Sequence, residues 1–160
     1  MRSAVTMKIP LRSLDRYDTD SKHMALISVT RLRVRSFRYL PGFMFYAFFS
    51  IRQAKRASGN LGIGVLNDAH RTFWTRTAWQ DEAAMRAFMM AVPHRRAMAK
   101  LVEWCNEASV VHWTQESPDL PDWHEAHRKM VAEGRRSKVR HPSPAHENYH
   151  IASPRIRSGT

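Results

Sequence analysis

The sequence predicts an α+β fold with the element order β-α-β-β-α-β, which is the ferredoxin-like pattern. The first observation is a change of hydrophobic period between Arg71 and Gln115. It goes from two residues to about 3.6 and back to two, which indicates a strand, a helix and a strand. The second is the same strand, helix and strand order between residues 24 and 66. A chain of 160 residues suits one domain with tails, and its single cysteine excludes an internal disulfide.

The first predicted strand, residues 24–35, alternates in polarity along its length. Since successive strand side chains point to opposite faces, the alternation predicts two different faces. We expect one face to carry Leu26, Ser28, Thr30, Leu32 and Val34, and the other Ile27, Val29, Arg31, Arg33 and Arg35.

The next elements follow from helical spacing and turn residues. Residues 43–57 have an apolar stripe and end in cations, which favour the carboxyl end of a helix dipole. Residues 61–66 alternate as a second strand. The turn chemistry of residues 67–70 then leads into a third strand, residues 72–79.

The second half begins with Asp81 and Glu82, acids that suit the first turn of a helix. Pro93 should break or kink this helix. Residues 109–115 form the predicted fourth strand, and Asp122 with Glu125 matches a capping box before a short helix. We therefore divide the chain into a flexible N-terminal arm (1–23), a barrel domain (24–116), a capping helix (117–134) and a basic extended tail (135–160).

One face of such a sheet is covered by the two helices of the pattern, and the other needs a separate cover. The strands carry more apolar area than a soluble protein leaves exposed. A second copy, placed sheet against sheet to form a barrel, would bury it. The sequence therefore predicts a homodimer with twofold symmetry.

Several motifs point to a known superfamily. The run from Thr77 to Phe88, followed by His94-Arg95-Arg96, Glu103-Trp104-Cys105 and Val111-His112-Trp113, resembles the dimeric α+β barrel superfamily, which includes antibiotic-biosynthesis-type monooxygenases. The closer likeness is to a family of uncharacterised bacterial barrel proteins, which share the acidic-capped helix at residues 120–126. A weaker likeness, across residues 31–88, is to spheroidene monooxygenase-like proteins. Together these likenesses cover about residues 24–142.

The resemblance implies a ligand cavity between the sheet and the helices of each protomer. The superfamily includes cofactor-free oxygenases, haem-binding oxygenases and decarboxylases, and members without known activity, so fold alone does not assign a reaction. We expect a monooxygenase-like enzyme that acts on a hydrophobic small molecule, either with haem or without a cofactor. The alternative is a non-catalytic ligand-binding or interaction module of the same fold.

Polar residues among the aromatic strands are the candidates for chemistry. His94, His112 and Arg76 are the candidate catalytic residues, since imidazoles move protons near neutral pH. Arg31 and Arg33, with His94, are the candidate cofactor-binding residues, because an arginine can bind a carboxylate or a haem propionate. The structural alternatives are a capping or hydrogen-bonded histidine and a solvated arginine.

Aromatic residues could line a pocket for a flat or extended apolar ligand, or could simply pack the core. The candidate pocket residues are Tyr46, Phe73, Trp74, Trp79 and Trp113. Gly62-x-Gly64 lacks the rest of a dinucleotide fingerprint, and no cysteine and histidine spacing typical of zinc is present. His124 and His127 are spaced i, i+3 as metal ligands can be, but we expect them on a solvated helix rather than at a metal.

The net charge of +12 is concentrated in residues 31–56 and in the tail. Nucleic-acid binding through the tail and peripheral membrane contact through residues 43–56 are therefore alternatives, of which we expect the first not to apply. No secretory signal or stretch long enough to span a bilayer is visible, so we expect a cytoplasmic protein.

Overall fold

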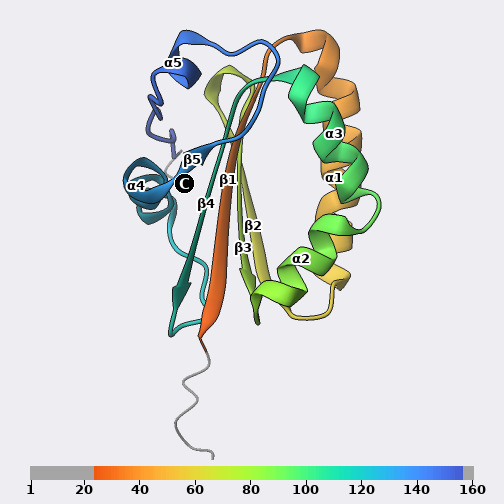
Figure 1. Cartoon of the computed structure of the whole chain (residues 1–160), viewed down its shortest axis with the longest axis vertical. Helices are drawn as coiled ribbons and strands as arrows, with labels where there is room; N and C mark the ends of the chain where they lie inside the picture. The colour runs from red at the N-terminus through yellow and green to blue at the C-terminus, as the bar shows by residue number, and fades with distance from the viewer. Residues whose placement is uncertain (1–23, 157–160) are drawn as a thin grey trace, which may run out of the picture.

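The computed structural model describes residues 24–156 and is built on an antiparallel sheet with the strand order β2-β3-β1-β4-β5 (Figure 1). Its first four strands are arranged as in the ferredoxin-like fold, which confirms the predicted fold class. The strands are β1 (Ala25–Val34), β2 (Asn60–Asp68), β3 (Thr72–Trp79), β4 (Cys105–Gln115) and the short β5 (Arg135–Arg136).

Three helices cover one face of the sheet and a fourth lies on the other side (Figure 1). The first three are α1 (Leu40–Arg56), α2 (Glu82–Met90) and α3 (His94–Trp104); the fourth is α4 (Trp123–Glu133). Short helical turns lie at Phe37–Tyr39, Ala69–Arg71 and Pro144–Glu147, the last being α5.

Local sequence signals set the ends of these helices. The Asp122 side chain accepts a hydrogen bond from the Glu125 backbone N–H, so the predicted cap of α4 is confirmed. Asp81, which was expected in the first turn of α2, precedes this helix and caps it by accepting from the Ala84 backbone N–H. The predicted break at Pro93 separates α2 from α3. Pro41 lies in the first turn of α1, where proline is tolerated, so this helix begins earlier than the sequence suggested.

The two faces of β1 belong to two different packing layers. Ile27 and Val29 are fully buried in a core that also contains Trp74 and Met130. Leu32 and Val34 pack instead with Phe43 beneath α1. The alternation predicted for this strand is therefore confirmed.

The cover on the second face differs from the one expected. Ala126 and Met130 of α4 close this face, together with Trp123 and Ile151. The argument for a homodimer from an uncovered sheet face is therefore wrong, because the chain supplies its own cover. The homodimer itself stays a prediction, since a single chain does not test it.

The segment after α4 is not merely an extended tail. Arg135 pairs with Val110 and adds β5 to the edge of β4, and α5 follows a few residues later. Ile151 packs into the core and Pro154 is buried. The predicted flexible arm, residues 1–23, lies outside the described residues. No helix in the described part of the chain is long and apolar enough to cross a membrane.

Candidate ligand cavity

A cavity of 690 Å³ lies between the sheet and helices α1, α2 and α3. Its floor includes Ser28 and Thr30 of β1 and Thr75 and Thr77 of β3. In the sheet, Ser28 faces Thr77 and Thr30 faces Thr75. These short hydroxyl side chains leave space beneath the helices that larger residues would fill, and they place polar groups at its base.

The walls of the cavity are largely apolar, as is usual for small-molecule sites. Aromatic and sulfur-containing side chains come from all three helices and from β3. They are Phe43, Met44, Tyr46, Phe73, Trp79, Met85, Phe88, Met89, Met98 and Trp104.

His112 of β4 lies at the floor, opposite Ser28 in the sheet register. His112, Ser28 and Thr77 therefore form one row across three strands. Burial lowers the pKa of the His112 imidazole, and the charge of Arg135 lowers it further. A neutral imidazole at the base of an apolar cavity can accept a proton from a bound molecule.

His94 lines another part of the cavity, at the start of α3. Its ring packs against Phe88 with the centroids 4.4 Å apart, and its backbone N–H donates to Gln53 Oε1 over 3.0 Å. Nδ1 lies 3.4 Å from the carbonyl oxygen of Met89. Burial lowers the pKa of this imidazole as well, although the contact with Met89 opposes the shift. The two candidate histidines thus line one cavity from different elements.

One further polar group in the wall has no partner. The Ser50 hydroxyl of α1 is buried, lines the cavity, and makes no hydrogen bond within residues 24–156. A buried polar group without a partner costs free energy, which a hydroxyl, carbonyl or amine of a ligand would recover.

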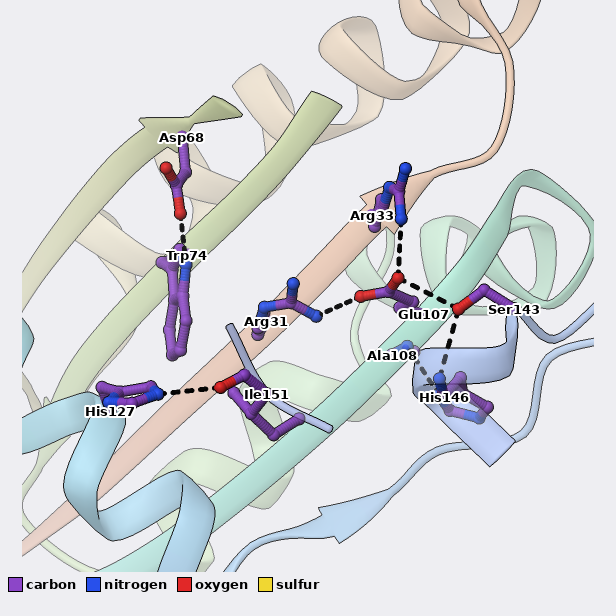
Figure 2. Close-up of polar contacts among 10 residues, drawn as sticks. All are labelled: Arg31, Arg33, Asp68, Trp74, Glu107, Ala108, His127, Ser143, His146 and Ile151. Atoms are coloured by element: carbon purple, nitrogen blue, oxygen red, sulfur yellow. Dashed lines mark hydrogen bonds and ion pairs between the residues drawn. The ribbon is translucent and has the colours of Figure 1, made fainter. Parts of the chain in front are cut away.

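Arg31 and Arg33 lie on the opposite face of the sheet and do not reach the cavity (Figure 2). Arg31 Nη1 is 2.5 Å and Arg33 Nη1 is 2.8 Å from the two carboxylate oxygens of Glu107. The Ser143 hydroxyl donates to the same carboxylate over 3.0 Å. Burial raises the pKa of Glu107, but the hydrogen bonds from the arginines outweigh it and the net shift is downward.

Arg76 also lies on the α4 side. Its guanidinium donates to the backbone carbonyl of Pro121 and lies 4.2 Å from the centre of the Trp123 ring. A Cβ at Gly64 would lie 2.7 Å from Arg76 Nε, so the glycine-rich β2 makes room for this arginine. The structure therefore does not bring Arg76, Arg31 or Arg33 together with His94 and His112.

The predicted aromatic residues divide in the same way. Tyr46, Phe73 and Trp79 line the cavity. Trp74 borders it too, but its indole N–H donates to Asp68 over 3.2 Å and its ring meets His127 on the α4 side (Figure 2). Trp113 packs in the α4-side core and does not line the cavity.

The expected haem-binding set does not fit this arrangement. Arg31 and Arg33, the candidate propionate partners, are held by Glu107 on the far side of the sheet from His94. We therefore derive no step through haem.

Sequence reasoning missed the hydroxyl floor and the cations at the β5 edge. The floor could have been found from the alternation of β1, where Ser28 and Thr30 share a face with Leu32. Arg135 and Lys138 border the cavity because β5 returns to the sheet, which no local pattern predicts.

Comparison with known proteins supports the fold. No protein-family model and no curated protein matches the sequence. A solved protein of unknown function from Nitrosomonas europaea is 18% identical with a TM-score of 0.52, over 62% of this chain and 97% of that one. A conserved protein from Methanosarcina mazei Go1 is 16% identical with a TM-score of 0.51, and the match covers 57% of this chain and 93% of that one. An antibiotic biosynthesis monooxygenase is 12% identical with a TM-score of 0.50, and the match covers 55% of this chain and 95% of that one.

The chain has the ferredoxin-like fold of the antibiotic-biosynthesis monooxygenase-like proteins. The similar structures are matched over nearly their whole length, whereas much of this chain lies outside the match. At these identities the likeness concerns the fold, and the reaction has to be argued from the cavity.

Proposed function

We propose that this chain is a monooxygenase-like enzyme that acts on a hydrophobic small molecule in the cavity. The observation that carries the proposal is a largely apolar chamber with a half-buried histidine in the row His112, Ser28 and Thr77. Likeness in fold to an antibiotic biosynthesis monooxygenase agrees with this assignment.

In this proposal His112 is the proton acceptor. Its lowered pKa keeps it neutral near pH 7, ready to take a proton from an enolic or phenolic group of the substrate. The electron-rich anion so formed would then react with dioxygen at carbon to give a hydroperoxide. Loss of water from this hydroperoxide would leave a new carbonyl, so that one oxygen atom enters the substrate and the other leaves as water. Hydroxyls on the floor would orient the substrate, and the surrounding apolar wall would exclude water.

Oxygen consumption tests the proposal directly. The purified chain would be mixed with a panel of apolar phenols and enolisable ketones, and its oxygen uptake would be compared with that of the variant His112→Gln. The matched control is His127→Gln, on the opposite face of the sheet. We expect uptake with at least one compound, a drop of at least about 100-fold in His112→Gln, and little change in the control. Equal uptake in His112→Gln would overturn its role.

The alternative function is a non-catalytic binding module of the same fold. This alternative is favoured because no side chain orients the His112 imidazole: within the described residues, its ring makes no hydrogen bond. Tight binding of several panel compounds without any oxygen uptake would select this alternative.

We also propose that the protein is a homodimer, as its resemblance to the dimeric α+β barrel superfamily implies. Sedimentation velocity measures its mass in solution, and a species of a single chain's mass at micromolar concentration would contradict the dimer.

A further inference from the structure

We propose that the ligand of the cavity is an amphipathic anion: an apolar body with a carboxylate or similar group held by Arg135 and Lys138. This inference rests on the proposed use of the cavity and specifies the class of molecule that enters it. It does not depend on whether the bound molecule is then oxidised.

The side chains with a permanent charge that line the cavity are all basic. Arg135, Arg136 and Lys138 border it, whereas none of its lining residues is an aspartate or glutamate. An apolar chamber with cations at one edge is complementary to a molecule with an apolar body and an anionic end.

The register places Arg135 on the cavity side. It pairs with Val110, which lines the cavity, and its charge acts on His112. Its neighbour Arg136 faces the other way, where its guanidinium donates to the backbone carbonyl of Glu147 over 2.7 Å. Alternation along a strand thus gives the two arginines different roles.

Arg135 and Lys138 are also free to bind a ligand. Both are exposed, and neither forms an ion pair with a carboxylate within residues 24–156. By contrast, Arg31, Arg33 and Arg35 are each within 2.8 Å of a glutamate oxygen. Carboxylates therefore neutralise Arg31, Arg33 and Arg35, whereas Arg135 and Lys138 have no counter-ion within residues 24–156.

Calorimetric titration with decanoate and with decanol tests this inference, since the two probes share a chain and differ in charge. We expect decanoate to bind at least about tenfold more tightly, and the double variant Arg135→Gln/Lys138→Gln to remove that preference while decanol affinity stays the same. Arg128→Gln, an exposed arginine on α4, is the matched control and should bind like the unaltered protein.

Equal affinity for the two probes, or an unchanged preference in the double variant, would overturn the inference. If decanoate binds more tightly than decanol but no compound gives oxygen uptake, the proposed enzymatic function is rejected and the proposed anion-binding site stands. Thermal unfolding of the double variant establishes that it is folded.

A second observation carries an independent proposal: the exposed face of α1 binds an anionic membrane surface. Phe45, Phe48 and Phe49 are 58%, 60% and 39% exposed. Helical spacing continues this face through Arg52, Lys55 and Arg56, all of which are exposed. Aromatic residues beside cations are the composition of an interfacial helix.

Charge favours a lipid surface over a second copy of the chain. No aspartate or glutamate occurs between Arg31 and Asn67, so pairing two such helices would bring cations together without counter-ions. Anionic lipids supply those counter-ions. Met44 is 49% exposed and also lines the cavity, so this surface adjoins the cavity wall.

Flotation with phosphatidylcholine vesicles, with and without about one-third phosphatidylglycerol, tests this proposal. We expect binding only to the anionic vesicles, with at least a tenfold loss in Phe45→Ser/Phe48→Ser. Val131→Ser, an exposed apolar residue on α4, is the control. Absence of binding at low salt, or a dimer that dissociates in the phenylalanine variant, would contradict the membrane role.

Discussion

The two faces of this sheet are built from alternate residues of the same strands and serve different purposes. On the α4 side, Trp74 and Met130 are fully buried, and a carboxylate holds two arginines. On the side of α1 to α3, short hydroxyl residues leave a cavity of 690 Å³. The comparison teaches that the α4 face is closely packed, whereas the face beneath α1 to α3 combines two buried clusters with an open cavity.

The largest expected effect is on the α4 side. Trp74→Ala should lower the free energy of unfolding by about 4 kcal/mol, because it removes a fully buried aromatic ring beneath α4. Thr75→Ala, next to it but on the cavity floor, should change stability by about 1 kcal/mol or less. Urea unfolding measures both, and equal losses would contradict the division of faces.

The Glu107 carboxylate should matter almost as much. Glu107→Gln removes the charge partner of Arg31, whose side chain is only 6% exposed, and should cost about 3 kcal/mol. The exposed pair of Glu82 and Arg86 provides the control, since Glu82→Gln should cost about 0.5 kcal/mol or less. If decanoate affinity fell in Glu107→Gln while the protein stayed folded, the α4 side would not be purely structural.

Filling the cavity should separate binding from stability. Thr30→Leu adds volume to the floor and should lower the affinity for apolar ligands by at least about tenfold, with a stability change within about 1 kcal/mol. Calorimetric titration and urea unfolding measure the two effects. A large loss of stability with unchanged binding would show that the space is not the ligand site.

The smallest effect concerns pH. Burial lowers the pKa of His94 and His112 below the ordinary value of 6.5, so as pH falls the unfolded chain takes up these protons first. The free energy of unfolding should therefore decrease as pH falls below about 6.5, until the folded histidines also protonate. His94→Gln should reduce this slope in urea unfolding between pH 7 and pH 5, and an unchanged slope would exclude His94 as a contributor.

Local patterns predicted much of this arrangement. The alternation of β1, the cap at Asp122 and the break at Pro93 follow from interactions between residues close in sequence. The resemblance to barrel proteins implied a cavity between sheet and helices, but the sequence left open which strand face lines it and so whether His94 and His112 share it.

Long-range packing decided the rest. Arg31 and Glu107 are 76 residues apart, so no spacing in the sequence could identify their ion pair, and Arg31 was expected at a cofactor instead. The cover supplied by α4 was missed for the same reason, since a capping box predicts that a helix forms but not where it packs.

The central claim is that ligands enter the face beneath α1 to α3 and leave the α4 side unchanged. Methyl-labelled methionine reports on both faces in one NMR titration with decanoate, because Met85, Met89 and Met98 line the cavity and Met130 is buried under α4. We predict large, saturable shifts for the three cavity methyls and an unmoved Met130 signal. Shifts led by Met130, or none at the cavity methyls at saturating ligand, would contradict the account.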